Sequence, residues 1–216
     1  MARLVPYLEA LRAHYGRPRV PKPQTPFEPF VRAILTPGAS PKSLEKALQT
    51  LRIFGLSDPD KIRDLDPETI ALAIKPVAGA HAKAIRLKTF VAWFADRFGG
   101  DLDRLRAVPA QQLREELLGI GGFGPEAVDL ILQRALGLPT AVVDTFTYRV
   151  LTRHDLAIQE AAYEDLKDIV ETQLPREAWG EFHSLMGQVG REFCRPQARC
   201  DRCPLKPLLP RGRGPA

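Results

Sequence analysis

The chain has 216 residues, a formal net charge of +5 and a hydrophobic content of 44%, which is enough for one large domain or two smaller ones to bury a core. No apolar run reaches the length of a membrane span, and the first residues lack the apolar centre of a signal peptide. We therefore expect a soluble cytoplasmic protein without a membrane partner.

The positive charge is concentrated at the two ends of the chain. Residues 1–24 carry five basic side chains against Glu9, and residues 191–216 carry seven against Glu192 and Asp201. The segment between them is mildly acidic. Two basic ends indicate either a polyanionic partner, most commonly nucleic acid, or solvated termini, and charge alone does not decide between them.

The starts of several helices can be read directly from the sequence. A capping side chain followed by proline suits the N-cap and the first helical position, where the missing N–H of proline costs nothing. This pair occurs at Thr25–Pro26, Ser40–Pro41 and Asp66–Pro67, and Thr25 with Glu28 also predicts a capping box. Further starts are predicted at Val108–Pro109, Gly124–Pro125 and Leu174–Pro175.

Apolar residues recur at helical spacing along most of the chain. The later helices are expected at 82–97, 109–118, 125–137, 144–153, 160–173 and 177–191. No segment shows the period-two alternation of a strand. The predicted fold class is therefore all-α.

The stretch "GIGGFGPEAV" at 119–128 carries four glycines within six residues. Its spacing matches a dinucleotide-binding fingerprint, but that fingerprint must follow a strand, and the preceding "AQQLREELL" reads as a helix. We therefore expect no nucleotide cofactor.

A tight turn between two helices can bind an anion, because the N–H groups of the turn and of the second helix point to one place. Gly122 and Gly124 would let a phosphate approach the backbone, and Phe123 between them would anchor the turn in the core. The alternative is a glycine-rich connection without a ligand.

The segment "LLGIGGFGPEAVDLILQRALGLPTAVVDTFTYRVLTR" resembles the helix–hairpin–helix and aspartate signature of the endonuclease III-like DNA glycosylases. The resemblance extends over most of the chain, through "PFEPFVRAILTPGASPKSLEKAL", "KAIRLKTFVAWFADRFGGDLDRL" and "EFHSLMGQVGREFCRPQARCDRCPL". It implies two helical domains that flank a DNA-binding cleft. Residues 25–137 would carry the hairpin (119–126), and residues 1–24 with 138–216 would carry a cysteine loop (194–209).

The resemblance also implies base excision repair on double-stranded DNA. Such enzymes flip a damaged base out of the duplex and cut its N-glycosidic bond. The two basic ends would then lie in one domain and form one surface that adds affinity for phosphates. We predict a monomer that works in the cytoplasm, on the nucleoid.

Asp144 matches the catalytic carboxylate of the signature. A carboxylate there would stabilise oxocarbenium character at the sugar or activate the attacking water. Taken from the residues alone, an aspartate just before a helix is an N-cap, and both roles can coexist.

Glu126 stands where the strand-cleaving relatives carry a lysine that forms a Schiff base with the sugar. This departure implies a monofunctional enzyme, similar to the branch that removes alkylated purines such as 3-methyladenine. Glu126 would position water or contact the base, or it only adds negative charge to a first helical turn. The alternatives are a DNA-binding protein that has lost catalysis and a lyase that uses another amine, such as Lys83.

Two loops that face DNA in the family also differ here. "LTPGAS" replaces a Gln-Asn pair, and "VAGAHAKA" offers only small side chains and His81 where wedging residues are expected. Lys83 in this loop matches the family and would contact a phosphate, or it is a solvated lysine at a helix start. His81 would face DNA or lie on an ordinary surface.

All three cysteines fall within ten residues, which favours a metal site over a disulfide framework. The family binds a [4Fe–4S] cluster through four cysteines. This chain supplies Cys194, Cys200 and Cys203, while Leu209 occupies the fourth position and no histidine lies nearby in the sequence. The alternatives are a cluster with three thiolates and an outside ligand, or a loop held by packing alone.

Overall fold

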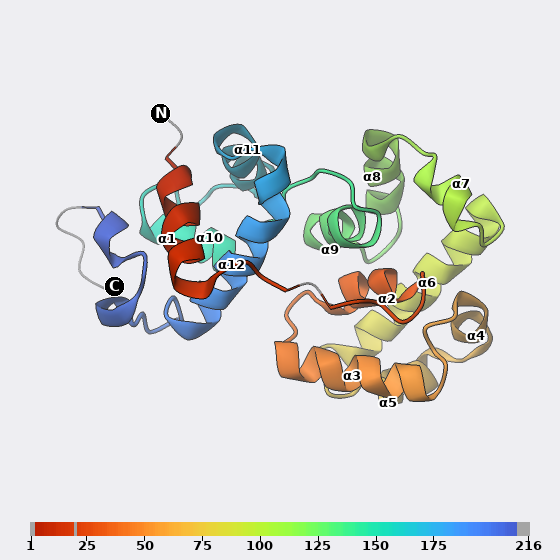
Figure 1. Ribbon diagram of the computed structural model, residues 1–216. Helices are drawn as coiled ribbons and strands as arrows, with labels where there is room; N and C mark the ends of the chain where they lie inside the picture. The colour runs from red at the N-terminus through yellow and green to blue at the C-terminus, as the bar shows by residue number, and fades with distance from the viewer. Residues whose placement is uncertain (1–2, 20, 211–216) are drawn as a thin grey trace. The chain divides into compact units, whose positions relative to one another are not determined.

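Every regular element is helical in the part of the chain that the structure describes, residues 3–19 and 21–210 of a computed structural model. The all-α prediction is therefore confirmed (Figure 1). Arg211 and Arg213, which contribute to the basic C-terminal end, lie outside the described residues.

The chain divides into two compact units. One unit takes the chain up to Pro21 and again from Pro139 onward, and the other runs from Lys22 to Leu138. We call them the terminal unit and the central unit.

The central unit is built on phenylalanine rings. Its helices are α2 (Glu28–Leu35), α3 (Pro41–Ile53), α4 (Pro59–Asp64), α5 (Pro67–Ala73), α6 (Ala80–Phe98), α7 (Leu102–Arg106), α8 (Ala110–Leu118) and α9 (Pro125–Leu130), followed by a π-helical turn (Ile131–Ala135). Phe27, Phe30, Phe90 and Phe94 are all buried, and their ring centroids lie 5.5–6.4 Å apart. Offset aromatic packing of this kind joins α2 to the long helix α6.

The predicted starts of α3 and α5 are confirmed. Ser40 accepts a hydrogen bond from Ser43 N (3.1 Å) and Asp66 from Thr69 N (2.8 Å), with proline as the first helical residue in both.

The start predicted at Thr25–Pro26 is wrong by two residues, because α2 begins at Glu28. Thr25 Oγ1 does accept from Glu28 N (3.1 Å), but the Glu28 carboxylate does not complete a capping box with Thr25. It is 1% exposed and accepts from Arg52 Nη2 (2.5 Å) and Nε (3.1 Å) instead. Pairing with a cation outweighs the cap because a buried carboxylate without a partner is costly.

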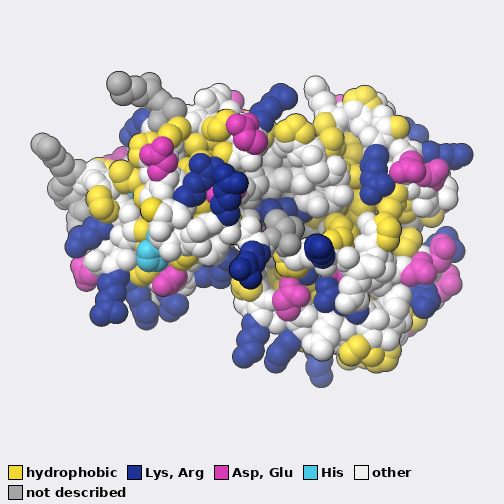
Figure 2. Space-filling model, in the orientation of Figure 1, with side chains coloured by type: hydrophobic (Ala, Val, Ile, Leu, Met, Phe, Trp, Pro, Cys, Tyr) yellow, Lys and Arg dark blue, Asp and Glu magenta, His cyan; other side chains and the backbone are white. Residues whose placement is uncertain are grey.

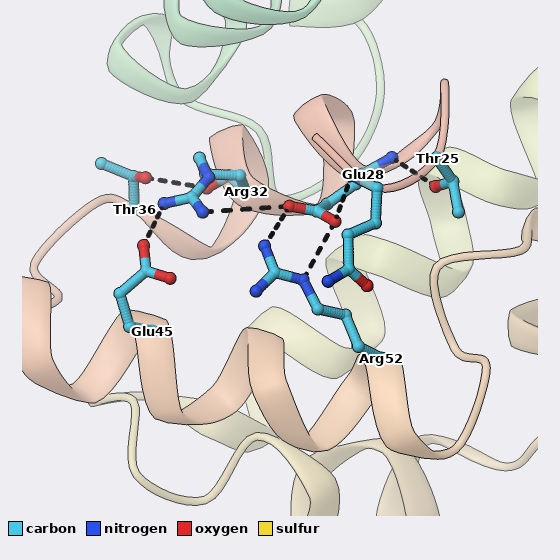
Figure 3. A network of polar contacts seen from close by, with 7 residues as sticks. Thr25, Glu28, Arg32, Thr36, Glu45 and Arg52 are labelled. Atoms are coloured by element: carbon cyan, nitrogen blue, oxygen red, sulfur yellow. Dashed lines mark hydrogen bonds and ion pairs between the residues drawn. The ribbon is translucent and has the colours of Figure 1, made fainter. Parts of the chain in front are cut away.

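Figure 3 shows that this carboxylate joins α2 to α3. Arg32 of α2 lies 3.9 Å from Glu28 and donates to Glu45 of α3 (2.5 Å). Burial raises the pKa of Glu28, but Arg52, the N–H of Gln24 and Arg32 together hold it below its usual range. The pair of helices is therefore tied by an ionised network.

The terminal unit brings both ends of the chain together. Its elements are α1 (Val5–Tyr15), α10 (Thr145–Arg153), α11 (Tyr163–Gln173) and α12 (Trp179–Glu192), with short 3-10 turns at Arg176–Ala178, Cys200–Arg202 and Lys206–Leu208. Helices α1 and α10 both pack on α12. Arg12 of α1 donates twice to the carboxylate of Glu181 on α12, at 2.8 Å each.

Candidate functional site

Asp144 is the N-cap of α10 and is held as an ionised carboxylate. Its Oδ1 accepts from Thr147 N (2.7 Å) and Thr147 Oγ1 (2.9 Å), while Oδ2 lies 3.5 Å from Nε2 of His183. The side chains of Asp144 and His183 are only 14% and 11% exposed. Burial raises the pKa of Asp144, but the His183 imidazole and the Thr147 bonds outweigh it and hold that pKa below its usual value.

His183 reaches Asp144 because α12 packs unusually closely against α10. Gly190 lies seven residues, about two turns, after His183 and so on the same side of α12. A Cβ at Gly190 would lie 2.4–2.6 Å from Phe146 of α10, closer than a side chain can approach. Glycine at this position therefore sets the helix separation that brings His183 to the carboxylate.

A cation lies near the same carboxylate. Arg191 is placed with its guanidinium carbon 5.4 Å from the centroid of the Phe146 ring. Burial lowers the pKa of Arg191, while the negative charge of Asp144 raises it. Neither Arg191 nor His183 was singled out from the sequence, because a lone basic residue in a helix carries no signal of its three-dimensional neighbours.

The glycine-rich turn joins α8 to α9 as a helical hairpin. Gly122 has a φ of +88°, a conformation that favours glycine, and Gly124 is the N-cap of α9 without a capping side chain. Phe123 between them is 7% exposed, and its ring centroid lies 6.3 Å from that of Phe90. The ring anchors the turn to the core of the central unit.

A buried ion pair locks the two helices of this hairpin. Arg114 of α8 donates to Asp129 of α9 through Nε (2.8 Å) and Nη2 (3.1 Å), and the Asp129 side chain is fully buried. A bidentate pair fixes orientation as well as distance, so it sets the register of α8 on α9.

Glu126 lies in the first turn of α9 and is half-buried. Its charge acts on Lys83 of α6, whose pKa falls to about 8 through burial, assisted by Arg86 and opposed by Glu126. Glu126 and Lys83 are thus electrostatic neighbours in the central unit.

The interpretation of Lys83 as a solvated lysine is wrong. The residue is 3% exposed, and Nζ donates to Leu35 O (2.8 Å) and Pro37 O (2.6 Å) at the C-terminal end of α2. Carbonyls at a helix end attract a cation, which explains why the ammonium turns inward. As placed, it offers no surface to a phosphate.

His81 lies exposed in the first turn of α6. Figure 2 shows Lys and Arg side chains scattered over the drawn face of each unit, with acidic side chains among them.

The three cysteines line one cavity of about 340 Å³ in the terminal unit. Cys194 is buried, Cys200 and Cys203 are half-buried, and all three are free thiols. Among the described residues, no group of three or more His, Cys, Asp or Glu side chains surrounds a single metal-ion position. Leu209, at the fourth ligand position of the family, also lines the cavity.

The donor set fits a [4Fe–4S] cluster only in part. Three thiols face one cavity, and burial together with the neighbouring thiols raises the pKa of Cys200 and Cys203. A cluster would be held by Cys194, Cys200 and Cys203, and it would need a fourth donor.

Comparison with known proteins finds relatives over almost the whole chain. The sequence is 34% identical over 196 residues to the "Putative DNA repair glycosylase MJ1434" of Methanocaldococcus jannaschii, covering 89% of each chain. It is 31% identical over 171 residues to Endonuclease III-like protein 1 of Bos taurus, covering 78% of this chain and about half (53%) of that protein. No family model matches the chain.

The fold is that of an endonuclease III. A trapped endonuclease III–DNA covalent intermediate superimposes with a TM-score of 0.79 at 22% identity, covering 96% of this chain and 95% of the other. An all-helical fold with this hairpin and a half-buried aspartate at the start of α10 defines a DNA glycosylase of the helix–hairpin–helix superfamily. The chain belongs to the endonuclease III-like DNA repair glycosylases within it. Within the described residues, no helix is long and apolar enough to cross a membrane.

Proposed function

We propose that the protein is a monofunctional DNA glycosylase that hydrolyses the bond between a damaged base and its sugar in duplex DNA. Two observations together carry this proposal. Asp144 is held as a charged carboxylate, and the hairpin position that would need an amine for strand cleavage is occupied by Glu126.

The environment of Asp144 supports an electrostatic role. A general base works best with a pKa near the working pH, and this carboxyl has a pKa below its usual value. Its fixed negative charge is better suited to stabilising positive charge that develops on the sugar as the base leaves. Water then attacks a sugar that already has oxocarbenium character.

The environment of Lys83 argues against its use as a replacement nucleophile. A lowered pKa would favour an attacking amine, but Nζ is buried and donates to two carbonyls. It would have to abandon both bonds to reach a sugar. Glu126 cannot form a Schiff base, so we assign it to water positioning or base contact.

The other predicted residues complete the proposal. The N–H groups around Gly122 and Gly124 would bind a backbone phosphate, with Phe123 holding the turn in place. His81 is exposed and available to the duplex. The central unit and the terminal unit would be the two domains that flank bound DNA, in a monomer.

A substrate whose damaged base is already cationic suits this site best. Such a base leaves as a neutral molecule and needs little acid assistance. We therefore place the protein with the branch that removes alkylated purines such as 3-methyladenine.

A base-release assay tests the proposal. Duplexes carrying 3-methyladenine, oxidised pyrimidine or uracil would be incubated with the protein, and half of each reaction heated in alkali. We expect breaks only after alkali, on the alkylated duplex, and none with Asp144→Asn.

Breaks without alkali would overturn the monofunctional assignment. Salt-sensitive binding without base release from any duplex would favour a DNA-binding protein that has lost catalysis.

A further inference from the structure

The cysteine cavity has a size that suits a cluster better than a single ion. Its volume of about 340 Å³ is on the order of ten times the volume that one water molecule occupies in the liquid. Three thiols, two arginines and one histidine lie on its wall, with Tyr148, Gln159, Leu205 and Leu209 among the remaining lining residues.

Arginines hold the loop that carries the first thiol. Arg153 Nη1 lies 3.4 Å from Cys194 Sγ and donates to Arg195 O (2.6 Å), while Nη2 donates to Pro196 O (2.9 Å). Arg149 Nη1 donates to Cys194 O (2.6 Å). These hydrogen bonds hold the loop that carries Cys194 against α10.

His154 lies on the wall of the same cavity, directly after α10. It is 6% exposed, and its Nδ1 lies 3.1 Å from Tyr7 Oη and 3.4 Å from Leu208 O. Tyr7 Oη in turn donates to Leu208 O at 3.1 Å. The imidazole therefore joins α1 and the C-terminal turn to the cavity.

These contacts favour one tautomer of the histidine. Tyr7 Oη donates its proton to Leu208 O, so Nδ1 meets Tyr7 Oη and Leu208 O as a donor. Nε2 is then the ring nitrogen with a lone pair. Histidines that bind metals commonly have this arrangement, with the second ring N–H donated to a carbonyl.

We propose that His154 supplies, through Nε2, the fourth ligand of a [4Fe–4S] cluster whose other ligands are Cys194, Cys200 and Cys203. The histidine replaces a thiol that Leu209, on the same cavity wall, does not provide. Imidazole is a competent ligand of iron in iron–sulfur proteins, where it replaces thiolate at one iron of the Rieske centres. This assignment is independent of the glycosylase activity.

The experiment compares His154→Asn with His154→Cys and the unchanged protein, all purified without oxygen. Asparagine keeps a donor toward Leu208 O but removes the Nε2 ligand, whereas cysteine provides the more usual thiolate. Iron and sulfide content, visible absorption and electron paramagnetic resonance would be measured, with the melting temperature of each iron-free protein as the folding control.

We expect about four irons in the unchanged protein. His154→Asn should lose one iron or the whole cluster, whereas His154→Cys, which loses the same buried ring, should retain four irons. Four irons held equally well by His154→Asn, or no iron in the unchanged protein after reconstitution with iron and sulfide, would overturn the proposal.

A second measurement does not depend on any variant that must fold. Pulsed electron paramagnetic resonance on the reduced protein, grown with ¹⁵N-labelled histidine, should show the hyperfine coupling of a directly bound imidazole nitrogen. An iron–sulfur signal without that coupling would overturn the proposal.

Discussion

Asp144 and Glu126 both lie at the start of a helix, eighteen residues apart, yet their surroundings differ. Asp144 is an N-cap with a hydrogen-bonded Oδ1 and a histidine at Oδ2. Glu126 is half-buried and lies two residues after the N-cap of its helix, Gly124. Asp144 caps its own helix and contacts His183, whereas Glu126 lies past the cap of its helix and acts on Lys83, so the same local pattern leads to two different environments.

The largest expected effect separates these two carboxylates. Asp144→Asn keeps an oxygen that can accept from Thr147 N but removes the charge, so base release should fall about a thousandfold, within the range of a lost catalytic carboxylate. Glu126→Gln should lower the rate by less than about tenfold. Single-turnover rates of base release by the two variants measure this difference. An equal loss of rate in both variants would contradict the distinction between the two carboxylates.

The next effect concerns the stability of the hairpin that carries Glu126. Arg114→Met takes a bidentate cation from the fully buried Asp129, and the free energy of unfolding should fall by about 3 kcal/mol. Urea denaturation measures it. The exposed pair Arg106–Asp103 offers the control, because loss of such a surface pair costs below about 1 kcal/mol. Similar losses in both variants would show that the buried pair does not lock the hairpin.

The packing that serves Asp144 can be tested at Gly190. A methyl group there meets Phe146, so Gly190→Ala should lower the free energy of unfolding by roughly 1–3 kcal/mol. The separation of α10 from α12 should also change, which reduces the effect of His183 on the carboxylate. The double variant Gly190→Ala with Phe146→Ala should recover part of the stability. If it recovers none, the loss does not come from the contact between the added methyl group and Phe146.

The smallest expected effect is a pH dependence of stability that comes from Lys83, the electrostatic neighbour of Glu126. Its pKa of about 8 lies below the ordinary lysine value, so the folded protein loses this proton before the unfolded chain does. Stability should therefore rise between about pH 8 and pH 10, by on the order of 1–3 kcal/mol. Lys83→Met should lack this rise in denaturation curves recorded across that range, and an unchanged pH dependence would contradict it.

Much of the fold could be predicted because its signals are local. Proline after Ser40 and Asp66 fixed two helix starts, and apolar spacing indicated the long helices. The start of α2 was misplaced because Glu28 pairs with Arg52, a partner from another helix. The long helix expected at 125–137 changes to a π-helical turn at Ile131, which no residue type announces.

The candidate site was predictable only where a motif carried it. Asp144 and the glycine turn stand in a recognisable order along the chain. His183, Gly190 and His154 act through contacts with residues far away in the sequence, and a single histidine or glycine in a helix gives no sign of such a partner.

Borohydride trapping tests the central claim most directly. Borohydride reduces a Schiff base between an amine of the protein and the sugar to a permanent link, and a strand-cleaving relative serves as the positive control. We predict base release by this protein with no trapped complex on the same DNA. A trapped complex would show that an amine attacks the sugar and would contradict the monofunctional assignment.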